Sequence, residues 1–215
     1  MELRVSQVAF GLEHGVLGAT PYRMGVWTQG CSLPKCPGCV STHTWSADGG
    51  RSIPVASLLG LARAQRVPPS GLTVSGGEPT DQAVAVAALT VGFRGAFPDA
   101  ELVLYTGLRW RVFAASFPEL AVQFDVVVAG PYVQTREATP LAGSRNQEVR
   151  LLTPRAERLY AGWASWPRHA LQVGQCQGGS LVTVGIPDTT RMARAARQVG
   201  AVGVTWDQDE ARRRP

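Results

Sequence analysis

The sequence lacks long hydrophobic runs, and it has almost no lysine. No uncharged apolar stretch of its 215 residues approaches the roughly 20 that a membrane-spanning helix needs. The N-terminus, MELRVSQVAF, has neither the cationic start nor the long apolar stretch of a signal peptide. All but one of the basic residues are arginine. These absences argue against a membrane protein and lead us to expect a cytoplasmic one.

Clustered positive charge is also missing. The formal net charge is +5, but the arginines are scattered and their densest run, residues 212–214, lies in the last few positions. This pattern indicates a solvated tail and no specific nucleic-acid partner. With 45% hydrophobic and 17% charged residues, the chain is not mainly disordered, and its length suits one well-buried core.

Strands and helices alternate along the first two thirds of the chain. Apolar or alternating runs predict strands at 4–10, 22–30, 71–77, 100–107 and 124–132. Helical spacing predicts helices at 52–65, with Ser52 as the cap, at 80–97 and at 110–120. The recurring order of strand, loop and helix predicts an α/β fold with a parallel sheet.

The pattern changes near residue 153. Residues 169–187 indicate two strands around a Gly-Gly turn, and residues 188–200 form an amphipathic helix pattern with Asp188 as its cap. No long linker precedes them. We therefore expect a core at 1–152 and a C-terminal extension at 153–215 packed on the same domain.

Four positions lie at or just past the C-terminal ends of predicted strands: Cys31, Gly76, Gly107 and Gly130. Parallel α/β sheets and barrels bind their ligands where the strands end. We expect these positions to line one edge of the sheet.

Three of the four cysteines, Cys31, Cys36 and Cys39, lie within nine residues, and Cys176 is far away. In a reducing compartment, such a cluster favours metal binding or redox chemistry over disulfides. A zinc site needs a fourth ligand, for which His43 is the nearby candidate. Three thiolates on a four-iron cluster would instead leave one iron open to the amino and carboxylate groups of a small molecule.

Several motifs in order carry a family resemblance: VWTQGC leading into CPGC with Trp45 after it, SGGEPTDQ, LVLYTG, DVVVAGPYV and LAGSRNQEVRLL. Over roughly residues 5–152 they resemble the radical S-adenosylmethionine (SAM) superfamily. More narrowly, they resemble the activating enzymes of anaerobic ribonucleotide reductase and related glycyl-radical activases. The resemblance implies a radical SAM core at 1–152 with the fold of an incomplete parallel (β/α) barrel.

The resemblance also implies roles for individual residues. Cys31, Cys36 and Cys39 would ligate a [4Fe-4S] cluster whose fourth iron chelates the methionine part of SAM. The implied cofactor-binding residues are Gly76, Gly77, Glu78, Pro79, Tyr105, Thr106 and Gly107. The two glycines of SGGEP would let the backbone approach the methionyl group, and the glutamate would lie near its amino group. The last three residues would contact ribose and carboxylate, and residues 143–147, GSRNQ, have no assigned role.

The implied reaction is reductive cleavage of SAM to a 5′-deoxyadenosyl radical, which removes a hydrogen atom from a glycine of a partner enzyme. An electron donor such as flavodoxin or ferredoxin is a further implied partner. A radical SAM enzyme that acts on a small molecule or peptide, as 7-carboxy-7-deazaguanine synthase does, is an alternative within the superfamily. A zinc or iron-sulfur binding module without catalysis is an alternative of another class.

The first gap of the cysteine motif departs from the family. Four residues, 32–35, separate Cys31 from Cys36, where the superfamily has three. Pro34 favours a bend. We expect the loop to bulge around Pro34 and Lys35 while the three thiols converge on one point.

Overall fold

A computed structural model describes residues 1–15, 17–167, 172–176 and 181–185. The strands are β1 (Glu2–Leu12), β2 (Arg23–Thr28), β3 (Arg51–Pro54), β4 (Gly71–Gly76), β5 (Glu101–Thr106), β6 (Val126–Ala129), β7 (Glu148–Leu151), β8 (Gln172–Cys176) and β9 (Leu181–Val184). The helices are α1 (Val55–Arg63), α2 (Ala83–Ala96), α3 (Trp110–Ser116), α4 (Pro118–Ala121) and α5 (Pro154–Leu159), with 3-10 turns η1 (Thr42–Thr44), η2 (Pro79–Gln82) and η3 (Trp163–Ser165).

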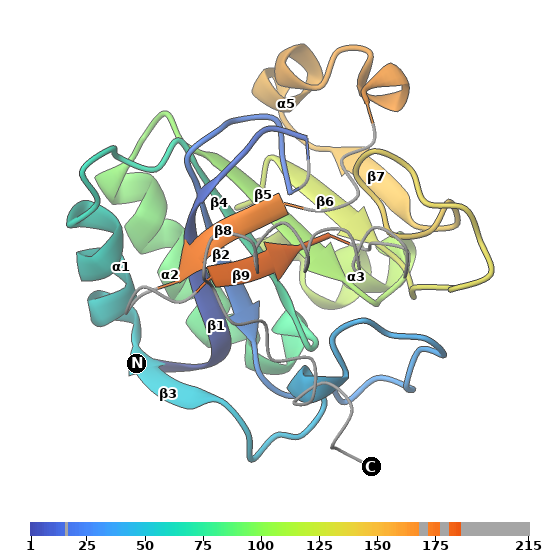
Figure 1. The fold of residues 1–215 in the computed structure, drawn as a ribbon, viewed down its shortest axis with the longest axis horizontal. Coiled ribbons are helices and arrows are strands. Elements are labelled where there is room, and N and C mark those ends of the chain that lie inside the picture. The colour runs from blue at the N-terminus through green and yellow to red at the C-terminus, as the bar shows by residue number, and fades with distance from the viewer. Residues whose placement is uncertain (16, 168–171, 177–180, 186–215) are drawn as a thin grey trace, which may run out of the picture.

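These strands form one mixed sheet with a parallel centre. The strand order is β7-β6-β5-β4-β2-β1-β8-β9, and β3 pairs with β1. Strands β2, β4, β5 and β6 are parallel, while β1 and β7 flank them in the antiparallel sense. Among the described strands the sheet stays open, with β7 at one end and β9 at the other (Figure 1). The α/β class is confirmed, and the closer description as an incomplete barrel stays a prediction.

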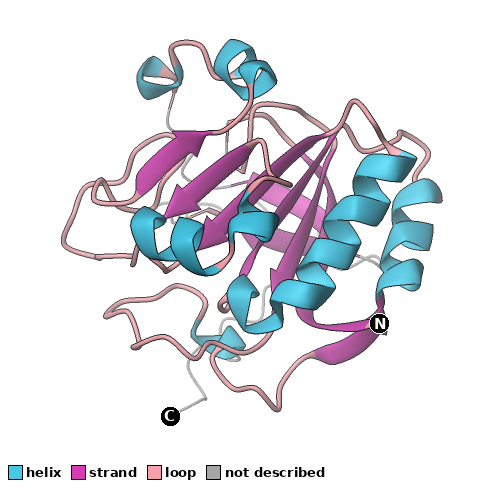
Figure 2. Cartoon of the chain, turned by 180° about the vertical axis from the view of Figure 1, so that it is seen from behind, coloured by secondary structure: helices cyan, strands magenta, loops and turns pink. Residues whose placement is uncertain are grey.

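Alternating residues of the central strands face two different layers. Leu102 and Leu104 pack with the buried sides of α1 to α4 in the main core. Figure 2 shows these helices on one face of the sheet. Val103, between the two leucines, packs on the other face in a smaller cluster that includes Ala156 of α5. The strands are therefore buried on both faces, as expected for parallel strands.

The expected helix at 52–65 is wrong at its start. Residues 51–54 form β3, which pairs with β1 in the register Arg4 with Ser52, and α1 begins at Val55. Ser52 does not cap the helix; its hydroxyl donates to Glu2 Oε2 at 2.5 Å. The residue before a proline favours an extended conformation, and here that residue is Ile53. The helix expected at 80–97 begins as the 3-10 turn η2 and becomes α-helical at Ala83.

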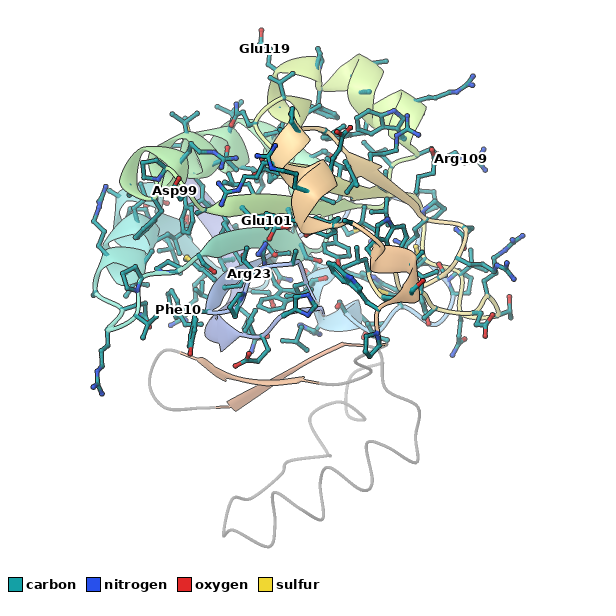
Figure 3. The ribbon with its side chains drawn as sticks, turned by 90° about the horizontal axis from the view of Figure 1, so that it is seen from above. Phe10, Arg23, Asp99, Glu101, Arg109 and Glu119 are labelled. Atoms are coloured by element: carbon teal, nitrogen blue, oxygen red, sulfur yellow. The ribbon has the colours of Figure 1, made fainter. Side chains whose placement is uncertain are left out.

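The C-terminal hairpin joins the same sheet. Strands β8 and β9 pair in the antiparallel sense, which confirms the two expected strands, and β8 also pairs with β1 through Phe10 and Gln175. Figures 1 and 3 show the hairpin lying across the side of the sheet opposite the helices, next to Phe10. The expected turn at 177–180 and helix at 188–200 lie outside the described residues. No helix of the described part of the chain is long and apolar enough to cross a membrane.

A buried ion pair joins the beginnings of the parallel strands. Arg23 at the start of β2 and Glu101 at the start of β5 are fully buried, with 2.7 Å between Nη2 and Oε2. The guanidinium lies over Gly71 of β4, where a Cβ atom would come within 2.1 Å of Nη1. Glu101 also accepts hydrogen bonds from the Tyr160 hydroxyl and from the Ala19 backbone. Figure 3 shows Arg23 and Glu101 side by side in the interior.

Candidate functional site

The C-terminal ends of the four parallel strands share one edge of the sheet, called the rim below. Strand β2 ends just before Gly30 and Cys31, β4 ends at Gly76, β5 ends before Gly107, and β6 ends before Gly130. The parallel pairing of β2, β4, β5 and β6 places these ends together, as the sequence predicted.

The segment from Cys31 to Trp45, called the cysteine loop, is closed at its base. Cys31 N donates to Trp45 O at 3.2 Å, and Gly30 N donates to Thr44 O at 2.8 Å. Gln29, only 3% exposed, adds side-chain bonds from Nε2 to the carbonyl oxygens of residues 43 and 46. Sequence reasoning missed Gln29, although it immediately precedes the Gly-Cys pair.

The three loop cysteines are half-buried free thiols. Cys39 N donates to Cys36 O at 3.1 Å, which makes a tight turn between the second and third. Burial raises the pKa of the Cys31 thiol, against the smaller opposing effects of a hydrogen bond with the Leu33 backbone and the charge of Lys35. Among the described residues, no group of His, Cys, Asp and Glu is arranged to hold a single metal ion. The convergence of the three thiols stays a prediction.

The first gap of the cysteine motif is fixed to the rim. Ser32 donates to both carboxylate oxygens of Asp81, from its backbone nitrogen at 2.7 Å and from its hydroxyl at 2.5 Å. Leu33 lies on Gly107, where a Cβ atom would come within 2.7 Å of Leu33 Cδ1. Pro34 and Lys35 are exposed, as the expected bulge requires. The longer gap therefore has defined contacts with the ends of β4 and β5.

The two glycines of SGGEP lie against the base of the cysteine loop. Gly77 N donates to Thr28 O at 2.9 Å, and Glu78 N donates to Gly30 O at 2.8 Å. A Cβ atom on Gly77 would lie 1.9 Å from Gly30 O. Gly76 has a φ of +110°, a conformation that favours glycine, and a Cβ there would lie 2.3 Å from Thr28 N. Both glycines are thus needed for close packing of two backbones, while their expected contact with the methionyl group stays a prediction.

Glu78 connects two strand ends from a buried position. It is 1% exposed, and its carboxylate accepts bonds from Thr80 N and Oγ1, from Thr106 Oγ1, and from Gly107 N at 2.8 Å. Burial raises the pKa of Glu78, although each of these hydrogen bonds acts to lower it. Pro79, also buried, begins η2 directly after it. Glu78 is therefore brought together with Thr106 and Gly107, whereas its contact with an amino group stays a prediction.

Tyr105 lies apart from Thr106 and Gly107. Its hydroxyl donates to Leu141 O at 2.8 Å, and its ring packs with the clusters on the face of the sheet opposite the helices. Burial raises the pKa of Tyr105 well above its ordinary value. Because neighbouring residues of a strand point to opposite faces, the side chains of Tyr105 and Thr106 lie on opposite faces of the sheet. The expected contacts of Tyr105, Thr106 and Gly107 with ribose and carboxylate stay a prediction.

Residues 143–147, GSRNQ, hold the loop that follows β6. Asn146 Nδ2 donates to Pro131 O at 2.8 Å, Gln147 Nε2 donates to Gly130 O at 3.0 Å, and the Ser144 hydroxyl accepts from Val133 N at 3.1 Å. The sequence matched this motif without giving it a role. The contacts identify it as a structural support of the rim.

Comparison with known proteins shows the family to which this chain belongs. The model of the 4Fe-4S single cluster domain matches residues 17–150, which is more than half of the chain. The chain belongs to this family. It is also 28% identical over 138 residues to the anaerobic ribonucleoside-triphosphate reductase-activating protein of Vibrio cholerae, covering 61% of this chain and 88% of that protein. The protein of the same name from Escherichia coli is 26% identical over 134 residues, covering 59% and 86%.

These matches confirm the resemblance to the radical SAM activases and support an iron-sulfur cluster in this family member. The donor set fits such a cluster, because soft thiolates are the ligands that iron-sulfur clusters prefer. All three loop thiols are free and come from one segment that is fixed at its base.

Proposed function

We propose that this protein is a radical SAM enzyme that generates a glycyl radical on a partner enzyme. Cys31, Cys36 and Cys39 would hold a [4Fe-4S] cluster, and SAM would bind at the iron that they leave free. When bound and reduced, the cluster supplies the electron that cleaves SAM to a 5′-deoxyadenosyl radical. The observation that carries the proposal is the direct bonding of the SGGEP turn to the base of the cysteine loop, from Glu78 N to Gly30 O.

The chain itself would orient the cofactor by joining three strand ends into one frame. Thr28 and Gly30 accept from the SGGEP turn, and Glu78 binds Gly107 N at the end of β5. Asp81 holds Ser32 at the start of the first gap. A cluster in the loop and a cofactor at the ends of β4 and β5 would therefore keep a fixed relation to each other.

The nature of the partner is supported by the two relatives, whose names describe activation of an anaerobic ribonucleoside-triphosphate reductase. We propose a glycyl-radical enzyme of that kind as the partner and a small redox protein, flavodoxin or ferredoxin, as the electron donor. A cytoplasmic location, as expected from the sequence, is part of this proposal.

The first experiment tests the cluster and the cleavage of SAM. The protein is reconstituted anaerobically with iron and sulfide, reduced, and incubated with SAM, and 5′-deoxyadenosine is measured. We expect product from the wild type and from Cys176→Ser, and none from serine variants of the three loop cysteines. A colourless protein that binds zinc and yields no 5′-deoxyadenosine would contradict the proposal.

The second experiment tests the substrate. An anaerobic ribonucleotide reductase from the same organism is added to the reduced protein with SAM, and its glycyl radical is measured by electron paramagnetic resonance. A radical on the reductase supports the activase. Formation of 5′-deoxyadenosine without that radical would favour a small-molecule or peptide substrate.

A further inference from the structure

The only lysine of the chain, Lys35, lies in the first gap of the cysteine motif. We propose that Lys35 is a positioning residue whose positive charge raises the reduction potential of the cluster held by Cys31, Cys36 and Cys39. This inference rests on the cluster ligation proposed above. It gives the longer gap of this chain a function.

The backbone on the N-terminal side of Lys35 is held in place. Ser32 is bound twice by Asp81, and Leu33 is packed on Gly107. A loop that is tied at these two points presents its next residues from a defined position. Lys35 is therefore not carried on a free insertion.

The Lys35 side chain turns back toward the loop although it is exposed. Its Nζ donates to Cys31 O at 2.6 Å and lies 5.3 Å from the centre of the Trp45 ring. An ammonium group over a tryptophan face is attracted by the ring, so the two contacts hold the charge beside the first ligand. None of the ion pairs among the described residues involves Lys35.

Two carboxyl groups near the same part of the rim would lower the reduction potential, in opposition to Lys35. Asp81 is bound to Ser32, and Glu78 lies buried at the end of β4. A negative charge at either position disfavours further negative charge in the cysteine loop. Lys35 is the cation that offsets them on the side of the cysteine loop.

Reduction adds one negative charge to a cluster. A fixed positive charge nearby stabilises the reduced state more than the oxidised state, which raises the potential. Because Lys35 is exposed, salt screens this interaction, and the effect weakens with increasing ionic strength.

The test is a redox titration of the reconstituted protein, followed by electron paramagnetic resonance and without SAM turnover. We expect Lys35→Gln to shift the midpoint potential to a more negative value and Lys35→Arg to stay near the wild type. The shift of Lys35→Gln should shrink in high salt. Arg66→Gln is the matched control, because Arg66 is exposed between α1 and β4, near the sheet edge opposite the rim.

The single lysine allows the same test without a substitution. Lys35 and the N-terminal amine are the amino groups that an amine-directed acetylating reagent can modify, and mass spectrometry measures the extent of their acetylation and of any acetylation elsewhere. Acetylation of the loaded wild type should lower the potential, while the same treatment of Lys35→Arg should not. This arm decides the question even if Lys35→Gln assembles no cluster.

Equal potentials for the wild type, Lys35→Gln and the acetylated protein would overturn the inference. A shift in Lys35→Arg as large as that in Lys35→Gln would also overturn it, because the charge is then not the cause. A wild type that binds no cluster contradicts both this inference and the proposed function. A wild type that binds a cluster but does not cleave SAM contradicts only the proposed function, and its potential still decides the role of Lys35.

Discussion

Replacing Gly77 by alanine tests whether the SGGEP turn and the cysteine loop form one unit. The added Cβ would lie 1.9 Å from Gly30 O, 2.7 Å from Gly30 C and 3.1 Å from Thr44 O. All three atoms belong to the backbone, so no side-chain rotation can relieve the clash. Either the turn after β4 or the base of the cysteine loop must move.

The expected cost follows from what that movement breaks. Gly77 N to Thr28 O and Glu78 N to Gly30 O are two backbone hydrogen bonds between the segments that this movement would break. Each bond contributes about 0.5–1.5 kcal/mol net. Overpacking typically adds about 1–3 kcal/mol. We therefore expect Gly77→Ala to lower the free energy of unfolding by about 2–6 kcal/mol, a large part of the roughly 5–15 kcal/mol of a typical domain.

The assay is anaerobic urea denaturation of the cluster-free protein, combined with iron content after reconstitution. Gly60→Ala is the matched control, because Gly60 lies within α1 and an added Cβ there meets no atom within 4 Å. Since alanine favours a helix over glycine by about 0.5–1 kcal/mol, the control should be slightly more stable than the wild type. A Gly77→Ala protein with wild-type stability and full iron content would refute the reasoning.

Three further predictions concern single side chains. Arg23→Met leaves Glu101 buried without its positively charged partner and should lower the free energy of unfolding by about 3–5 kcal/mol in urea titrations. Arg150→Met, which removes an exposed ion pair, should change it by less than about 1 kcal/mol. Burial holds the pKa of Glu78 above its ordinary value of 4.5, so the stabilisation due to its protonation is lost as pH rises through the folded pKa. The unfolding free energy of the wild type minus that of Glu78→Gln should therefore fall from pH 4.5 toward neutrality. Gln29→Ala removes two bonds at the base of the cysteine loop and should lower stability by about 1–3 kcal/mol, with faster proteolysis inside the loop.

The strands at the centre of the sheet could be predicted because each is a short apolar run that ends in glycine or in the Gly-Cys pair. The start of α1 could not be predicted in the same way. Residues 51–54 pair with β1, about fifty positions earlier, and no local pattern records that contact. Helix α5 carries a local signal in the sequence, because Thr153 caps it and Pro154 is its first residue.

In the candidate site, too, features with a local sequence pattern could be predicted, and contacts between distant residues could not. Motif order was sufficient to place the cysteine loop and SGGEP on one rim, because the ends of parallel strands share an edge. The clamp of Asp81 on Ser32 joins residues 49 positions apart, and Leu33 meets Gly107 across two strands. These contacts depend on the packing of the loop over the sheet, which single-sequence patterns do not encode.

Glycine has a different packing role at each of the two edges of the parallel sheet. At the beginnings of the strands, Gly71 makes room for the guanidinium of Arg23, so that an ion pair closes that edge across three strands. At the rim, Gly76 and Gly77 make room for the backbone before Cys31. A side chain at any of these glycines would separate neighbouring strands, but only at the rim would it also displace the thiol loop. Substitutions at Gly71 should therefore affect stability alone, whereas substitutions at Gly77 should affect stability and iron binding together.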